Sequence, residues 1–435
     1  MRINTKNYIL KKMSLKLVNK NYLNWFKDKK IADYIDNSPR HLEDLRFYIN
    51  KVNKNSNTYF WAIFKNKKHV GNIKIFEINY KKKIGRLGIL IGEKKFRNIG
   101  LGQEVIEAIK NFLLKKNILY LWLGVQSKNL QAIRSYEKCG FFKYKTKKKI
   151  MYMRCNIFTS KVILGGAQLN SNYGITNFKN KTISKKETKR IVNFSKQKNI
   201  WHIDGAESYK LFKDNNIGLL KNFKIDTKIS LKNISNYKNL KTILIRKYLK
   251  NNVKVDTLFI HDGDNIFKNS MDKKINILLK LKKNRLISKI GISLYDFSLL
   301  KKIISKLSVD VIQVPYNVVD NRLEKFRKLL QRKKVKVYAR SIFLQGSLLK
   351  KVSEIKELGD IYEKVKKSSK KINKSNFDAC INFVLTNDLV DKIIIGVRNL
   401  KEMKQLVNFK SRLKMKSIKF KKQEKLFAYK PSEWK

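Results

Sequence analysis

The segment IWHIDGAESYK (residues 200–210) carries the pattern on which the fold of the larger half of the chain rests. Its apolar residues lead into an acid, Asp204, and a phenol, Tyr209, follows five residues later. A short apolar run of this kind is typical of a buried strand that ends in a polar loop. This loop is either a polar turn or one part of a catalytic centre, whose other members then lie at the ends of neighbouring strands.

Further short apolar runs repeat this pattern between residues 161 and 398, and lysine-rich segments of helical length separate them. Strands that are buried on both faces, each followed by a helix, are typical of a parallel sheet closed into a (β/α)8, or TIM, barrel. We therefore expect an α/β barrel over residues 160–410 and a basic, peripheral tail over 411–435. The expected strands, besides 200–206, lie at residues 161–169, 224–230, 255–262, 287–294, 310–317, 335–343 and 391–398.

In such a barrel the active site lies where the strands end, at the C-terminal rim. The third expected strand brings Lys228 to this rim and the fourth brings His261, beside Asp204 and Tyr209. An ammonium group next to a phenol favours the phenolate and lowers its pKa, and a carboxylate keeps that ammonium charged and in place. A histidine there can hold a substrate carbonyl. We predict that these four residues form a catalytic group.

These four residues resemble the catalytic tetrad of the aldo-keto reductases, and the resemblance extends over about residues 161–408. It implies that hydride passes from NADPH to an aldehyde or ketone while Tyr209 donates a proton, with Lys228 and Asp204 tuning the phenol and His261 orienting the carbonyl. Further stretches that look like this family are LGGAQLNSNYGI (164–175), IDGAESY (203–209), KIGIS (289–293) and IQVPYN (312–317).

The same resemblance assigns the nicotinamide site. It implies that Ser293 and Gln313 bind the carboxamide, although Leu294 replaces the asparagine that usually follows the serine. Arg340 stands where many members place an aromatic residue that stacks on the nicotinamide. Arg398 is a candidate for binding a 2′-phosphate, so the sequence favours NADP(H) over NAD(H).

The first part of the chain, up to about residue 157, alternates strand and helix patterns without a regular unit. Three successive runs with short polar turns between them suggest an antiparallel meander. A helix with one apolar face follows a glycine turn at residues 100–102. The expected strands lie at 59–65, 69–80, 83–92, 119–125 and 150–156, with a second helix at 130–138.

The stretch EKKFRNIGLGQEVI (93–106) places a glycine turn between a strand and a helix. Glycines let the backbone approach a ligand closely, and the N–H groups at a helix start suit a pyrophosphate. Val105 replaces the third glycine of the dinucleotide motif G-x-G-x-x-G, which counts against a dinucleotide here. The candidate pyrophosphate-binding residues are Arg97, Asn98, Ile99, Gly100, Leu101 and Gly102.

This loop, together with NLQAIRSYEKCGF (129–141), resembles the GNAT family of acetyl-CoA-dependent N-acetyltransferases over about residues 1–156. The resemblance implies an α+β domain with a mixed sheet over 1–157. Asn129 would contact acetyl-CoA and Tyr136 would protonate the departing thiolate. The stretch at residues 22–36 looks like the acceptor-side opening of such enzymes, and Glu77 is either a general base or part of a solvated strand face.

The formal net charge of +67 raises the question of a nucleic-acid partner. The lysines are spread over nearly every segment, whereas nucleic-acid binders usually cluster their cations on one stripe, so no specific nucleic-acid partner is expected. The three cysteines lack metal-ligand spacing, and the chain has neither a long apolar run nor a signal peptide. We expect a soluble, cytoplasmic protein without a metal site.

Taken together, these patterns predict a bifunctional enzyme that joins N-acetyl transfer to carbonyl reduction. A sugar or sugar-nucleotide substrate, as in the synthesis of a nonulosonic acid for a surface glycan, fits both activities. Two alternatives stay open: a protein N-terminal or lysine acetyltransferase with a barrel that has lost its redox role, and a polyanion-binding protein on these scaffolds.

Overall fold

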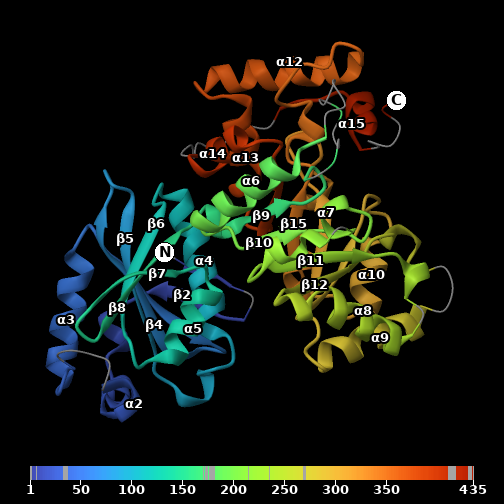
Figure 1. Cartoon of the computed structure of the whole chain (residues 1–435). Coiled ribbons are helices and arrows are strands. Elements are labelled where there is room, and N and C mark those ends of the chain that lie inside the picture. The colour runs from blue at the N-terminus through green and yellow to red at the C-terminus, as the bar shows by residue number, and fades with distance from the viewer. Residues whose placement is uncertain are drawn as a thin grey trace. The chain divides into compact units, whose positions relative to one another are not determined.

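The computed structural model describes residues 2–5, 7–32, 38–169, 171, 175, 182–213, 215–234, 236–267, 271–409, 418–429 and 434. The chain divides into two compact units, Met1–Ser160 and Lys161–Lys435 (Figure 1). Each unit has its own sheet and its own buried core.

The first unit is built on one eight-stranded sheet in the order β1-β2-β3-β4-β5-β6-β8-β7. Neighbouring strands are antiparallel except β5 and β6, which run parallel, so the predicted mixed sheet and its central meander are confirmed. The strands are β1 Arg2–Asn4, β2 Ile9–Lys12, β3 Tyr59–Lys65, β4 Lys68–Asn79, β5 Ile84–Ile91, β6 Tyr120–Gln126, β7 Phe142–Lys147 and β8 Ile150–Asn156.

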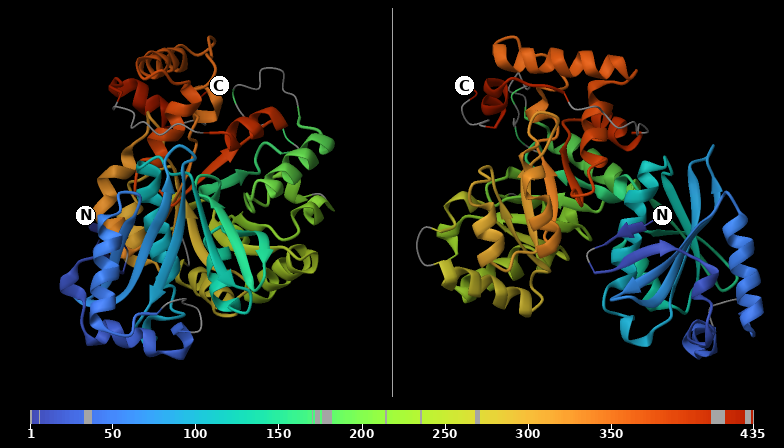
Figure 2. Two further views of the ribbon diagram at one scale, coloured as in Figure 1. Left: turned by 90° about the vertical axis from the view of Figure 1, so that its left-hand side faces the viewer. Right: turned by 180° about the vertical axis from the view of Figure 1, so that it is seen from behind.

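Helices cover the two faces of this sheet unequally. On one face, α4 (Leu101–Lys115) and α5 (Leu130–Lys138) bury their apolar sides against residues of β3, β4, β6 and β8. On the other face, α1 (Lys20–Asn24) and α3 (Leu42–Lys54) pack a smaller core against β3. Figure 2, left, turns the side of this unit that carries α3 toward the reader.

Strands β5 and β6 pair over only a short part of their length. Their register joins Ile84 to Tyr120, Gly85 to Leu121 and Arg86 to Trp122, whereas β5 continues to Ile91 and β6 to Gln126. The sheet is therefore open at the end of β5 from which the chain passes into α4.

The second unit is a closed barrel of eight parallel strands in the order β10-β11-β12-β13-β14-β15-β16-β9. Every predicted strand of this half is present, so the barrel prediction is confirmed. The strands are β9 Val162–Gly165, β10 His202–Asp204, β11 Lys224–Ile229, β12 Lys254–Ile260, β13 Lys289–Ser293, β14 Val311–Pro315, β15 Lys336–Arg340 and β16 Lys392–Gly396.

Helices follow the strands around the barrel, as a βα repeat requires. They are α6 Lys185–Gln197, α7 Lys210–Lys213, α8 Tyr237–Lys247, α9 Met271–Lys283, α10 Leu300–Lys306, α11 Arg327–Lys333, α12 Lys356–Lys371, α13 Asn376–Leu385 and α14 Leu400–Val407.

Large side chains fill the barrel interior below the rim. Phe259, Val311 and Tyr338 form a buried cluster with Ile163 and Ile394. The first three lie two positions before His261, Gln313 and Arg340 along their strands, so this cluster forms a layer beneath the rim residues. The candidate catalytic residues thus stand on a packed core rather than over a channel.

Part of the segment predicted as a tail forms α15 (Lys422–Ala428). Its Glu424 is buried and forms an ion pair with Lys364 of α12, in which Nζ of the lysine lies 2.5 Å from Oε1 of the glutamate. Trp434 is also buried and donates from Nε1 to the carbonyl of Phe427 at 2.9 Å. Within the predicted tail, residues 411–417, 430–433 and 435 lie outside the described residues.

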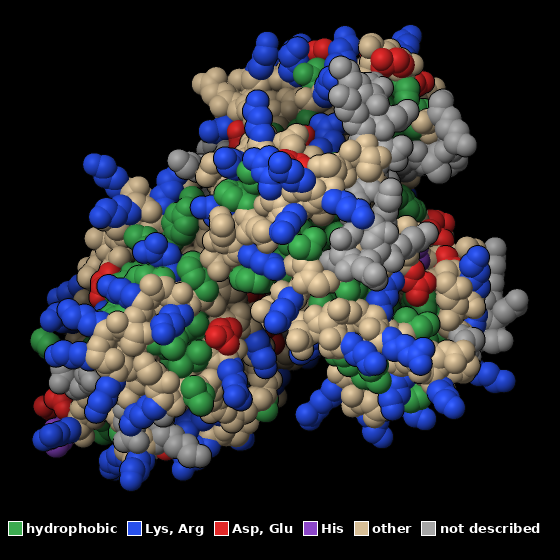
Figure 3. Space-filling model, viewed as in Figure 1, with side chains coloured by type: hydrophobic (Ala, Val, Ile, Leu, Met, Phe, Trp, Pro, Cys, Tyr) green, Lys and Arg blue, Asp and Glu red, His purple; other side chains and the backbone are tan. Residues whose placement is uncertain are grey.

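Lys and Arg side chains are spread over the whole visible face of the molecule rather than gathered in one stripe (Figure 3). Among the described residues, no helix combines the length and the apolar character that crossing a lipid bilayer demands.

Candidate active sites

A cavity of about 700 Å³ opens at the C-terminal rim of the barrel. Each candidate from the second half of the sequence lines it, and each comes from the end of a barrel strand or from the loop that follows one. These residues are Asp204 at the end of β10 and Tyr209 after it, Lys228 in β11, His261 after β12, Ser293 in β13, Gln313 in β14, Arg340 in β15 and Arg398 after β16.

A buried ion pair forms the floor of this cavity. Lys228 Nζ lies 2.5 Å from Asp204 Oδ1 and donates a second hydrogen bond of 3.1 Å to the carbonyl of Gly205. Gln313 Nε2 donates to the same Asp204 oxygen at 2.7 Å. All three side chains are buried, so each charge is met by a partner where water is excluded.

Tyr209 lies above this ion pair. The Nζ atom of Lys228 is 5.4 Å from the centre of the Tyr209 ring. The backbone N–H of Tyr209 donates to Ala206 at 3.1 Å, which closes a tight turn after the strand. Gly205 is required in this turn because the ring of Phe212 occupies the place of a β-carbon.

His261 is held at the rim by its backbone, which donates to the carbonyl of Ile229 at 2.8 Å. Burial lowers the pKa of this histidine, and the charges of Lys228 and Arg340 lower it further, against an opposing effect of Asp262 and Asp204. The imidazole is therefore neutral at neutral pH, and its one N–H can donate a hydrogen bond to a substrate carbonyl oxygen.

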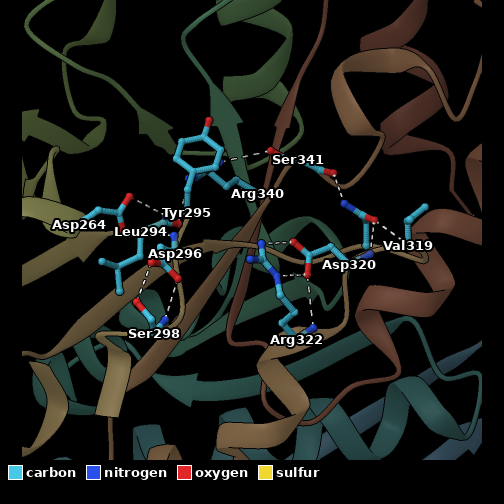
Figure 4. A network of polar contacts seen from close by, with 11 residues as sticks. Asp264, Leu294, Tyr295, Asp296, Ser298, Val319, Asp320, Arg322, Arg340 and Ser341 are labelled. Atoms are coloured by element: carbon cyan, nitrogen blue, oxygen red, sulfur yellow. Dashed lines mark hydrogen bonds and ion pairs between the residues drawn. The ribbon is translucent and has the colours of Figure 1, made fainter. Parts of the chain in front are cut away.

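Arg340 is stacked on Tyr295, a residue that the sequence analysis missed. Its guanidinium carbon lies 3.7 Å from the centre of the Tyr295 ring, and Nη2 donates to the carbonyl of Leu294 at 3.0 Å (Figure 4). Tyr295 is 44% exposed and lines the cavity. A tyrosine two positions after Ser293 was the available signal, but nothing in the sequence connected it with Arg340.

Arg398 is paired with Glu402 at the start of α14. Its Nε and Nη2 atoms donate to Glu402 Oε1 at 3.1 and 3.0 Å, and its backbone N–H donates to Oε2 at 2.8 Å. Glu402 also lines the cavity. A carboxylate thus lies beside Arg398, the residue predicted to bind a 2′-phosphate. The sequence analysis did not anticipate this carboxylate.

A second buried polar cluster lies deeper in the barrel. His202, Asp226 and Asp256 bring possible ligand atoms within 4.8 Å of one another, the one such group in the described part of the chain. Lys289 forms an ion pair with Asp256. Burial raises the pKa of Asp256, but Lys289, His202 and Lys224 outweigh it and hold the pKa well below its usual range. The ammonium of Lys289 makes this a salt-bridged cluster rather than a cation site.

The rim fits the nicotinamide end of a dinucleotide. Gln313 Oε1 is a buried side-chain oxygen that has no hydrogen-bond partner among the described residues. Because Asp204 holds the amide nitrogen of Gln313, this oxygen is left as an acceptor for a carboxamide N–H. Ser293 is also buried at the cavity wall and supplies a hydroxyl nearby.

In the first unit, the candidate pyrophosphate loop precedes α4. Asn98 and Gly100 both have left-handed backbones, with φ of 65° and 87°, and a β-carbon at Gly100 has no atom within 4 Å. These two residues lie directly before α4, whose first N–H groups have no intrahelical acceptor. Leu101 and Gly102 form the first turn of the helix, and Ile99 is exposed.

Arg97 contributes differently from the rest of this loop. Its backbone N–H donates to the carbonyl of Lys94 at 3.1 Å. Its guanidinium donates to the carbonyls of Ile91 and Gly92 and forms an ion pair of 2.8 Å with Asp28. Arg97 therefore braces the loop, and its backbone N–H is already bonded within the chain.

The second motif places Asn129 and Tyr136 at the two ends of one short helix. Asn129 is the N-cap of α5, and its side-chain oxygen accepts from the backbone of Ala132 at 3.1 Å. Tyr136 packs against the main core of this unit and against Phe141. Burial, with a smaller effect of Cys139, raises the pKa of Tyr136 to about 12, so this phenol stays protonated at neutral pH.

Two candidates for the acceptor side are Glu77 and the stretch at residues 22–36. Glu77 is exposed on β4 and forms an ion pair of 2.9 Å with Arg86 of β5. Of the stretch at residues 22–36, residues 33–36 lie outside the described part of the chain, while Tyr22 and Trp25 are buried.

Comparison with known families matches both halves. The model of the Aldo/keto reductase family matches residues 161–425, more than half of the chain. The model of the Acetyltransferase (GNAT) domain matches residues 9–142. No curated protein matches the chain.

Solved structures with similar folds correspond to one half of the chain at a time. The holo form of the aldo-keto reductase AKR11C1 from Bacillus halodurans is 17% identical, with a TM-score of 0.45, and covers 62% of this chain and 91% of its own. A chimera of the spermidine N-acetyltransferase SpeG from Vibrio cholerae and hSSAT is 16% identical, with a TM-score of 0.31, and the match covers 35% of this chain and 98% of that chain.

The pKa of His261 provides a direct test of this geometry. In the intact chain it should lie below the ordinary value of histidine, because burial and two nearby cations disfavour the imidazolium. Lys228→Met and, separately, Arg340→Gln should each raise it by removing one of those cations. Titration of histidine resonances by NMR, with His261→Asn to assign the signal, measures the shift. An intact-chain value at or above the ordinary one contradicts the described arrangement.

Proposed function

This chain belongs to the aldo/keto reductase family, and from that premise we propose that Tyr209 is the proton donor of a carbonyl reduction in its barrel. The observation that supports this most is the buried pair of Lys228 and Asp204 directly below the Tyr209 ring. The ammonium stabilises the phenolate that remains after the proton leaves, so the phenol gives up its proton more readily.

The other rim residues have complementary roles in this proposal. A bound nicotinamide dinucleotide would supply a hydride to the carbonyl carbon. Gln313 and Ser293 would hold its carboxamide. His261, kept neutral by its surroundings, would bind the carbonyl oxygen and orient it toward Tyr209. The carbonyl oxygen receives the Tyr209 proton and becomes the product hydroxyl, and solvent then returns a proton to Tyr209.

The first unit is a GNAT acetyltransferase domain, and we propose that it acetylates an amine. The amine nitrogen attacks the thioester carbon of acetyl-CoA, a carbon–nitrogen bond forms, the carbon–sulfur bond breaks, and the amine loses a proton to solvent. Tyr136, protonated at neutral pH, gives its proton to the departing sulfur. The N–H groups from Asn98 to Gly102 would hold the pyrophosphate, and Asn129 would contact the cofactor.

We propose an amino sugar as the common substrate class of the two activities. A sugar offers both a carbonyl for the barrel and, after amination, an amine for the first unit. Synthesis of a nonulosonic acid or a related surface sugar fits this combination. Acetylation of protein amines, with a barrel that has no redox role, is the alternative that the experiments below separate from it.

Replacing Tyr209 with Phe should lower the rate of carbonyl reduction by roughly 10²- to 10⁴-fold, the usual contribution of a general acid. Binding of NADPH should be unchanged, since the hydroxyl of Tyr209 is not proposed to touch the cofactor. NADPH consumption with an aromatic aldehyde measures the first effect and quenching of NADPH fluorescence the second. A variant that keeps the full rate rules out Tyr209 as the donor, and intact protein without NADPH quenching rules out the redox role of the barrel.

The choice between NADPH and NADH should depend on two residues at the start of α14. We propose that Arg398 receives the 2′-phosphate, and Glu402 weakens that attraction because it is bonded to the same guanidinium. Glu402→Gln should therefore raise kcat/KM for NADPH relative to NADH by about tenfold, and Arg398→Gln should lower the ratio by a similar factor. If the ratio of kcat/KM for NADPH to that for NADH is the same in the unsubstituted chain and in both variants, neither residue contacts the 2′-phosphate.

Replacing Tyr136 with Phe should lower acetyl transfer by roughly 10²-fold or more while the KM for acetyl-CoA stays within about twofold, because only the proton to sulfur is lost. Release of free thiol from acetyl-CoA measures the rate. Tyr120→Phe, on a strand of the same sheet, is the matched control. An unchanged rate in Tyr136→Phe assigns this tyrosine to the core alone.

A further inference from the structure

Part of the sheet in the first unit keeps one face accessible. On the side where α1 and α3 pack against β3, the strands farther along the sheet, β5, β6, β8 and β7, present side chains that are exposed or half-buried. Gly124 and Arg154 are exposed, and Tyr144 is 37% exposed. This face is the one that Figure 2, left, turns toward the reader.

The register of the strands sets cations and aromatic rings side by side across this face. Phe76 of β4 is paired with Arg86 of β5, Arg86 with Trp122 of β6, and Trp122 with Arg154 of β8. We call the resulting row the cation–aromatic belt. It consists of Lys74, Phe76, Arg86, Trp122, Tyr144, Lys145, Tyr152 and Arg154.

The cations of the belt lie over the faces of its rings. Arg86 lies between two rings, with its guanidinium carbon 5.0 Å from the centre of Phe76 and 4.8 Å from that of Trp122. Lys145 and Arg154 lie 4.7 Å from the rings of Tyr152 and Tyr144 respectively.

Two rings of the belt are nearly parallel to each other. The planes of Trp122 and Tyr152 meet at 27°, with their centres 6.3 Å apart. A flat ring system can stack on such a surface while nearby cations hold an attached anion.

The charge of the belt limits the kind of ligand. Of its four cations, Arg86 alone has an acidic partner among the ion pairs of the described residues, and that partner is Glu77. A polyamine would meet an excess of like charge here, which costs binding energy. A nucleotide combines an aromatic base for the rings with phosphates for the lysine and arginine side chains.

The belt also borders the opening between β5 and β6. Pairing of these strands ends at Arg86 and Trp122, which are both belt residues. Just beyond them, Gly88 and Gly124 place no side chain on the accessible face. A thioester held by the loop before α4 would reach this face through the opening, so an acceptor bound on the belt presents its amine where the acetyl group arrives.

We propose that the cation–aromatic belt binds the nucleoside diphosphate part of the acetyl acceptor, so that the acceptor is a nucleotide-linked amino sugar rather than a free sugar, a polyamine or a protein. The base stacks on Trp122 and Tyr152, and Lys145 and Arg154 bind the diphosphate. This inference rests on acetyl transfer by the first unit and specifies its substrate class.

Competition among amines tests the substrate class. With acetyl-CoA and the full chain, thiol release should show a KM for UDP-glucosamine that is about tenfold or more below that for glucosamine, because the base and diphosphate add contacts that free sugar lacks. Spermidine should be a poorer acceptor than either. Equal or better turnover of glucosamine or spermidine overturns the inference and leaves acetyl transfer in place, whereas no binding of CoA to the chain overturns acetyl transfer itself.

Binding of UDP alone tests the belt without any turnover. UDP should quench tryptophan fluorescence of the full chain, and Trp122→Phe should remove most of that quenching. The double variant Lys145→Gln/Arg154→Gln should weaken UDP binding by about tenfold or more, since it removes two charge-assisted contacts to phosphate. Lys143→Gln is the matched control: Lys143 is exposed on the same strand, but it pairs with Met153 on the opposite, core-facing side.

Three outcomes would overturn the assignment: no binding of UDP to the intact chain, equal weakening by Lys143→Gln, or UDP binding unaffected by the double variant. Single-stranded DNA serves as a competing probe. If the double variant loses DNA binding while its affinity for UDP and its KM for UDP-glucosamine stay unchanged, the belt is a nucleic-acid surface instead.

Discussion

The buried ion pair of Lys228 and Asp204 is the interaction on which the barrel site depends. Two charges removed from water are stabilising only if each finds partners, and here Gln313 and the carbonyl of Gly205 complete the arrangement. The pair keeps a fixed positive charge below the Tyr209 ring, and the ammonium of Lys228 lowers the pKa of His261 against a smaller opposing effect of Asp204. One oxygen of Asp204 binds both Lys228 and Gln313, so the ammonium below the proposed proton donor and the amide proposed to face the cofactor share one anchor.

The first unit follows a different principle, since the surface proposed to bind the pyrophosphate is made mainly by backbone. Asn98 and Gly100 have left-handed backbones directly before α4, and Arg97 uses its guanidinium to brace the loop. Side-chain cations lie instead on the opposite face, in the cation–aromatic belt. In a chain with a net charge of +67, what distinguishes a binding surface is thus the geometry of its donors and rings rather than the presence of lysine.

Much of this could be predicted from the sequence because apolar runs and strand-end residues are local signals. The eight strands of the barrel and the convergence of Asp204, Tyr209, Lys228 and His261 follow from them. The edge strands β1 and β7, and β2 beside β1, were missed, because they are short or rich in lysine and bury few residues. The contacts of Arg340 with Tyr295 and of Arg398 with Glu402 were also missed, since they depend on which side chains meet after folding.

The stacking of Arg340 on Tyr295 makes the residue at each of these two positions depend on the residue at the other. An arginine at the cavity wall is supported by the ring beneath it and by the carbonyl of Leu294. If the tyrosine were lost first, the arginine would lose the surface that orients it, and if the arginine were lost first, an exposed ring would remain at the entrance. The two positions should therefore covary among descendants of this gene, with the aromatic residue at 295 retained only in lineages that keep a guanidinium at 340.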